Sequence, residues 1–128
     1  MIPIKQTKFG DEGNCFAACI ASLLECDINC VPFLGKDEDW DEYATRLNSF
    51  LKENHQIILS WDEYISENYS DFVNLDLKDS FYIVSGKAAR GFEHAVIYKN
   101  GILKHDPHSD NSGIENINHI YWFYRLFV

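Results

Sequence analysis

A cysteine at the expected start of a buried helix is the first residue in this sequence that could do chemistry. Cys15 follows Gly13-Asn14 and directly precedes an almost wholly apolar run that continues to Leu24. A thiol in that position lies at the positive end of the helix dipole, beside backbone N–H groups without intrahelical partners. Both features favour the thiolate, which is the nucleophilic form of cysteine. We therefore interpret Cys15 as a catalytic nucleophile whose own N–H donates to an oxyanion.

A hairpin predicts which residues would serve that nucleophile. His94 begins a strand-like run, Asp106 directly follows the next one, and Asn100-Gly101 between the runs is a strong β-hairpin signal. With the turn centred there, the residues opposite His94 fall at about positions 106 to 108. Asp106 would then orient the imidazole and leave its other nitrogen for the thiol. We predict a catalytic triad of Cys15, His94 and Asp106, with His119 as the alternative base.

Three further residues are candidates for contacts with the substrate. Gln6, upstream of the nucleophile, could add a side-chain amide to the oxyanion hole, and Asn14 is the alternative donor. Arg90 lies in the loop just before His94, where it could contact an acidic group of the substrate. The sequence does not distinguish whether the Gln6 or the Asn14 amide donates to the oxyanion.

The remaining cysteines and histidines raise the question of a metal site. We expect Cys19 to be a packing residue, and Cys26 and Cys30 to be structural or incidental. A four-cysteine zinc site is the alternative, but this spacing inside an apolar helix differs from the usual zinc knuckle. His105 and Asp106 are neighbours on an expected strand and would point to opposite faces. We therefore expect no metal and no other cofactor.

The chain reads as helices followed by strands. Hydrophobic periodicity and turn signals predict helices at 15–25 and 39–54 and strands at 56–60, 81–84, 94–98, 102–105 and 120–128. Residues 61–69 are ambiguous, with a short helix as one possibility. The acidic cluster at residues 37–42 is interpreted as a helix cap and a solvated face. We predict one α+β domain spanning residues 1–128, with N-terminal helices packed on an antiparallel sheet.

Composition excludes some partners. The formal net charge is -9 and the pI is about 4.8, which argues against nucleic acid or an anionic membrane as the main partner. No stretch is long and apolar enough for a membrane span, and the first residues lack a signal peptide's hydrophobic region. We expect a cytoplasmic protein with reduced cysteines. The oligomeric state cannot be derived from these features.

The candidate residues together resemble the papain-like cysteine peptidase superfamily. Gln6, Cys15, His94 and Asp106-Pro107 look most like its compact bacterial branch, which includes the bacteriocin-processing (double-glycine leader) peptidases. The runs at 94–98 and 101–108 also resemble a small phage and bacterial group of this fold. Gly13-Asn14-Cys15-Phe16 is similar to a motif of ovarian-tumour-type deubiquitinases. The resemblance implies a papain-like fold with the site between helix and sheet.

The expected activity follows from the triad and the resemblance. We predict a cysteine hydrolase that acts on an amide or thioester bond of a peptide, a protein or a small amide, as a peptidase, amidase or deamidase. Acyl transfer to an amine would use the same groups. The alternatives are a non-catalytic papain-like binding or inhibitory module of phage or bacterial origin, and the small zinc protein described above.

Overall fold

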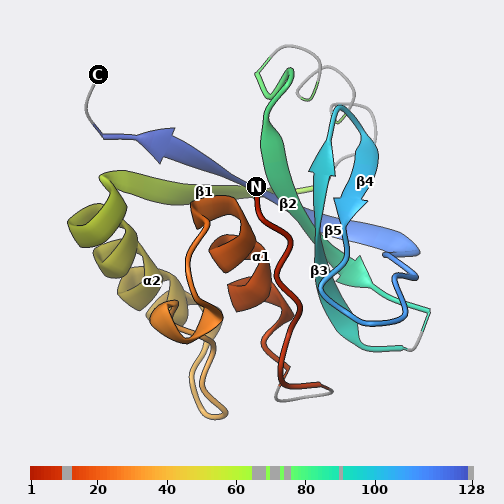
Figure 1. Cartoon of the computed structure of the whole chain (residues 1–128), viewed down its shortest axis with the longest axis horizontal. Helices are drawn as coiled ribbons and strands as arrows, with labels where there is room; N and C mark the ends of the chain where they lie inside the picture. The colour runs from red at the N-terminus through yellow and green to blue at the C-terminus, as the bar shows by residue number, and fades with distance from the viewer. Residues whose placement is uncertain (10–12, 65–68, 70–72, 74–75, 90, 127–128) are drawn as a thin grey trace.

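A computed structural model describes residues 1–9, 13–64, 69, 73, 76–89 and 91–126. Within these ranges the elements follow in the order α1 (Cys15–Leu24), the 3₁₀ turn η2 (Ile28–Cys30), α2 (Trp40–His55), β1 (Ile57–Glu63), β2 (Phe81–Lys87), β3 (Glu93–Lys99), β4 (Ile102–His105) and β5 (Asn116–Arg125). The strands form one antiparallel sheet in the order β1-β5-β2-β3-β4. Helices α1 and α2 pack against this sheet (Figure 1), which confirms the α+β class.

Both helices begin and end within one residue of the predicted bounds. The Asp39 carboxylate accepts the Glu42 N–H at 2.8 Å and caps α2, as the acidic cluster predicts. Helix α1 ends at Glu25, which adopts a left-handed conformation and returns its N–H to the Ala21 carbonyl.

The predicted hairpin joins β3 to β4. Asn100 and Gly101 have φ angles of 52° and 78°, so both central turn residues are left-handed, which suits the twist of a two-residue hairpin. A bulge between Ile97 and Tyr98 then places His105 opposite Ile97. The bulge shifts the register by one residue, so that His105 lies opposite Ile97 rather than Val96.

Four strands extend beyond the residues predicted for them, β3 by one residue at each end. Residues 61–63 belong to β1 rather than to a short helix, and positions 65–68 of the ambiguous run lie outside the described residues. Strand β2 continues through Gly86, where an added Cβ would lie 1.8 Å from the Asn116 carbonyl oxygen. Strand β5 begins four residues earlier than predicted, at Asn116, and residues 127–128 are not described. A side chain at position 86 would separate β2 from β5, so glycine is required there.

The sheet has a hydrophobic cluster on each face. One joins α1 and α2 to the sheet through Ile20, Leu47, Leu51, Leu59, Ile83, Ile97 and their neighbours. The other packs Val73 and Leu77 against Tyr82, Val84, Val96 and Ile120. Successive residues of β2 and β3 alternate between the two clusters, as strand geometry requires. The first cluster fixes α1 against β3, the strand that carries His94.

The four cysteines are free thiols. Cys19 is fully buried in the helix–sheet cluster, and burial raises the pKa of its thiol well above the ordinary value. This confirms Cys19 as a packing residue. Across the described ranges, no helix has the length and apolar character that a membrane crossing demands.

Candidate active site

Cys15 is the first residue of α1, and the residue before it does not cap the helix. The Asn14 side chain instead accepts the N–H groups of Thr7 and Lys8, each at 2.9 Å, and donates to the Thr7 hydroxyl at 2.8 Å. Asn14 therefore anchors the segment upstream of the helix. The first turn of α1 lines a pocket, so its uncapped N–H groups are available near the thiol.

His94 and Asp106 form a buried pair beneath this pocket. The imidazole Nε2 lies 2.6 Å from Asp106 Oδ1, and each residue is 3% exposed. The same carboxylate accepts the His108 N–H on Oδ1 at 2.8 Å and the Gly113 N–H on Oδ2 at 2.7 Å. Three donors therefore hold the carboxylate in one orientation.

These contacts set the charges of the pair. Burial alone would raise the pKa of Asp106, but the hydrogen bonds from His94, Gly113 and His108 hold that pKa below its ordinary value. Burial alone would lower the pKa of His94, but the hydrogen bond to Asp106 and the interaction with Cys15 raise it to about 9. The imidazole therefore carries a proton at neutral pH, beside an ionised carboxylate.

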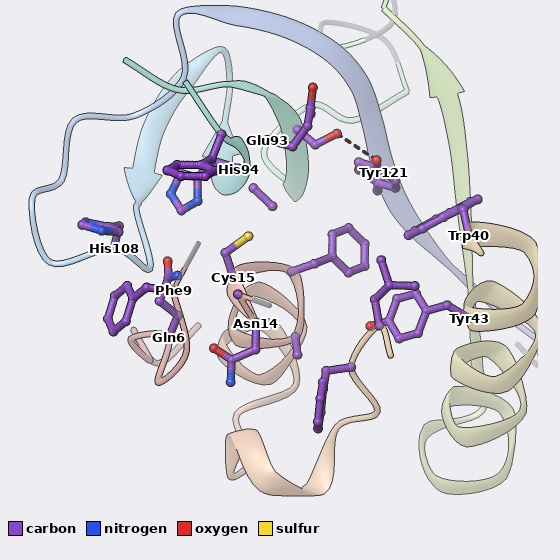
Figure 2. A pocket seen from close by; sticks show the side chains of 18 of the residues that line it. Gln6, Phe9, Asn14, Cys15, Trp40, Tyr43, Glu93, His94, His108 and Tyr121 are labelled. Carbon is purple, nitrogen blue, oxygen red and sulfur yellow. Dashed lines mark hydrogen bonds between the residues drawn. The ribbon is translucent and has the colours of Figure 1, made fainter. Parts of the chain in front are cut away.

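The structure brings the three residues predicted for the triad together. The Cys15 and His94 side chains face each other across the pocket (Figure 2), and the neighbouring Cys15 raises the pKa of His94. Asp106 lies on the far side of the imidazole and occupies Nε2, so Nδ1 is the ring nitrogen left for the thiol. A thiol, an imidazole and a carboxylate in this order can transfer a proton from sulfur to nitrogen.

Gln6 lies in the same pocket with an unsatisfied polar atom. The side chain is 8% exposed, and Nε2 donates to the Lys8 carbonyl at 2.8 Å. Oε1 has no hydrogen-bond partner among the described residues. Buried polar atoms normally have a partner, and Nε2 carries a second hydrogen that can point into the pocket. Of the two amides considered from the sequence, Asn14 positions backbone, whereas Gln6 retains hydrogen-bonding capacity at the site.

The segment of Lys5 and Gln6, called the strap below, binds the loop that carries Asp106, which the sequence did not predict. Lys5 Nζ donates to the Asp106 carbonyl at 2.9 Å, the His108 carbonyl at 3.1 Å and Asn111 Oδ1 at 2.7 Å. The Gln6 N–H donates to the Pro107 carbonyl at 3.0 Å. The strap holds the loop of Asp106 against the segment of Gln6. A lone lysine near the N-terminus gives no sequence signal for this role.

The pocket around Cys15 has a volume of about 570 Å³ and a largely aromatic wall. Gln6, Phe9 and His108 lie on one side of Cys15, and Trp40, Tyr43 and Tyr121 lie on the other (Figure 2). The Phe16 ring packs edge-on against three of these rings, with centroids 4.9–6.3 Å apart. The sequence pattern indicated that Trp40 and Tyr43 share a helix face, but it did not show that this face borders a site.

The remaining candidates from the sequence are Arg90, His119 and His105. Arg90 is outside the described residues. His119 is on β5 opposite Ser85 and does not line the pocket. His105 donates from Nε2 to the Ile4 carbonyl at 2.7 Å and does not line the pocket. Within the part of the chain that the structure describes, no group of three or more His, Cys, Asp or Glu side chains is arranged to hold a metal ion.

Comparisons with known proteins return no match: no family model, no curated protein and no solved structure is significantly similar to this chain. The functional assignment therefore rests on the residues and geometry of the Cys15 pocket.

Proposed function

We propose that this protein is a cysteine hydrolase of papain-like fold that cleaves an amide or thioester bond. The observation that carries the proposal is the position of His94. Its ring lies between the Cys15 side chain and the buried Asp106 carboxylate, where α1 begins. A protonated imidazole there stabilises a thiolate and can later donate its proton.

Acylation of the enzyme is the first half of the reaction. The Cys15 thiolate, paired with the protonated imidazole of His94, attacks the substrate carbonyl to form a C–S bond. The carbonyl electron pair moves to oxygen, and the intermediate collapses as the bond to nitrogen or sulfur breaks. His94 gives its proton to the departing amine or thiolate. Asp106 stays ionised and stabilises the imidazolium.

Deacylation completes the cycle with water as the second substrate. His94 accepts a proton from water while the oxygen attacks the acyl carbon, and the C–S bond breaks to release a carboxylic acid. The same steps describe a peptidase, an amidase or a glutamine deamidase, which differ only in the group on each side of the carbonyl. An amine in place of water would give acyl transfer.

The developing oxyanion needs donors above the first turn of α1. The Cys15 backbone N–H begins the helix, and Gln6 lines the same pocket with a side chain that retains a free N–H. Loss of one such donor typically lowers kcat by about 10²–10³. Gln6→Leu, which keeps the approximate size of the side chain, should therefore lower kcat more than it changes KM.

The proposal is tested by thioester hydrolysis and by thiol reactivity. We expect hydrolysis of N-acetyl amino-acid ethyl thioesters by the native protein and none by Cys15→Ala. Cys30→Ala, which removes an exposed thiol away from the pocket, is the matched control and should retain the activity. Cys15 should also react with iodoacetamide at pH 7 faster than free cysteine does.

Two results would overturn the proposal. One is equal activity in the native and Cys15→Ala proteins. The other is a Cys15 alkylation rate no greater than that of free cysteine at the same pH. Either result would favour a binding module in which the three residues have only a structural role.

A further inference from the structure

Exposed hydrophobic side chains gather around Cys15. Phe9, Phe33, Leu34 and Phe92 are 44–53% exposed, and all four line the same pocket. They come from three separate segments: the N-terminal segment before α1, the connection before α2 and the loop before β3. Scattered surface hydrophobics are ordinary, but apolar groups that converge from distant segments on one hollow indicate a binding surface.

The inner wall on one side of Cys15 is rigid and aromatic. Trp40 packs edge-on against Phe16 at 5.5 Å and against Tyr43 at 5.6 Å between ring centroids. The Tyr43 hydroxyl donates to the Pro32 carbonyl at 2.8 Å, and the Tyr121 and Ser85 hydroxyls lie 2.8 Å apart. These hydrogen bonds satisfy the polar ends of the rings and leave their apolar faces towards the pocket.

The lining of the pocket is mostly uncharged. Among the described residues that line it, Glu93 is the only acidic side chain, and it is exposed. The chain as a whole carries a formal net charge of -9. A lining with so few charged side chains suits an uncharged group, because burial of an unpaired charge costs free energy.

We propose that the aromatic side of this pocket binds an uncharged aromatic or branched aliphatic side chain of the substrate, next to the carbonyl that Cys15 attacks. The inference rests on the proposed function, because it names the substrate class of that site. A volume of about 570 Å³ holds such a side chain together with the neighbouring peptide groups. Burial of an apolar side chain there would strengthen binding in proportion to the apolar area removed from water.

The test compares N-acetyl ethyl thioesters of phenylalanine, leucine, glycine and aspartate, with thiol release followed by chromatography. We expect kcat/KM to be about tenfold higher for phenylalanine and leucine than for glycine. The aspartate substrate should react more slowly than the glycine substrate. A phenylalanine-to-glycine ratio within about twofold of one, or a preference for aspartate, would overturn the inference.

A charged substitution at Leu34 tests whether the substrate preference arises in this pocket. Leu34→Asp should reduce the phenylalanine-to-glycine ratio towards one, whereas Leu34→Phe should preserve it. Ile102→Asp is the matched control, because Ile102 is 59% exposed on β4 and does not line the pocket. The ratio compares two substrates on one protein sample, so a change in the folded fraction does not alter it. An equal loss of the ratio in Leu34→Asp and Ile102→Asp would contradict the inference.

A binding experiment separates this inference from the hydrolase proposal. In Cys15→Ala, N-acetyl-phenylalanine amide should produce a saturable NMR shift of the Trp40 indole N–H, and adding Leu34→Asp should weaken it. Saturable binding without hydrolysis of any thioester would support the pocket and reject the enzyme. Hydrolysis without a side-chain preference or a Trp40 shift would support the enzyme and reject the pocket.

Discussion

Replacement of Asp106 by asparagine tests the electrostatics of the site directly. The substitution preserves the shape of the side chain, and its oxygen can still accept hydrogen bonds from His94 and His108. Its NH₂ group would then face the Gly113 N–H, which donates to Oδ2 at 2.7 Å in the native protein. Two donors would oppose each other in a buried site.

The expected loss of stability follows from these contacts. A buried N–H left without an acceptor costs about 1–3 kcal/mol. The bond to His94 changes from one between ionised groups, at 2.6 Å, to one with a neutral acceptor, which costs about 1 kcal/mol more. We therefore expect Asp106→Asn to lower the free energy of unfolding by about 2–4 kcal/mol near pH 6.

The pH dependence has a defined sign. Because the pKa of His94 is about 9, above the ordinary value of 6.5, its contribution to stability is complete below about pH 6.5 and is lost as the pH rises through 9. Asp106 has a lowered pKa, so its contribution is present above its ordinary value of 3.8 and is lost as the pH falls through its native pKa. In Asp106→Asn, burial lowers the pKa of His94 because the carboxylate no longer opposes that effect. The variant should therefore lose less stability than the native protein does between about pH 6.5 and 9.

The assay is urea unfolding at about pH 6 and pH 9.5, together with an NMR titration of the His94 ring. Asp39→Asn is the control, since Asp39 is an exposed helix cap that asparagine can replace. The control should retain the native pH dependence. A stability change below about 0.5 kcal/mol in Asp106→Asn, with an unchanged His94 titration, would refute the reasoning.

Three further predictions concern the cysteines, the strap and the sheet. Cys19, which is fully buried, should be alkylated by iodoacetamide only after unfolding, while exposed Cys30 reacts in the native state. Peptide mapping that finds equal alkylation rates for Cys19 and Cys30 in the native protein would contradict the burial of Cys19. Lys5→Met should lower kcat for thioester hydrolysis several-fold and shift the His94 titration, because it releases the Asp106 loop; Lys52→Met on α2 should do neither. Gly86→Ala should lower the free energy of unfolding by about 3 kcal/mol or more, since its Cβ would lie 1.8 Å from the Asn116 carbonyl oxygen. Gly35→Ala is the control, because an added Cβ there would have its nearest contact at 3.6 Å. Equal urea midpoints for the two variants would contradict the close approach of β2 and β5.

Local patterns were sufficient for the elements that carry the proposed triad. An apolar run after Gly13-Asn14 predicts a helix that begins at Cys15, and Asn100-Gly101 predicts the turn that places Asp106 near His94. Each pattern lies within a short window, where turn chemistry and side-chain periodicity determine the backbone. The α+β class follows from the order of these windows along the chain.

Local patterns did not predict the strand lengths or the bulge in β4. Strand β5 begins at Asn116 because it pairs with both β1 and β2, so its extent depends on partners far away in the sequence. The bulge at Ile97 and Tyr98 changes the register by one residue without a distinctive residue type. Such features arise from tertiary packing, which overrides local preference.

The sequence by itself determined the position of Cys15 at the start of α1, the hairpin and the pairing of His94 with Asp106. Only the tertiary structure decided that Asn14 anchors backbone while Gln6 lines the pocket, and that Lys5 holds the Asp106 loop. It also decided that α1, α2 and β5 contribute rings to one pocket. The physical reason is distance along the chain: Lys5 and Asp106 are 101 residues apart, and no local pattern encodes a contact of that separation.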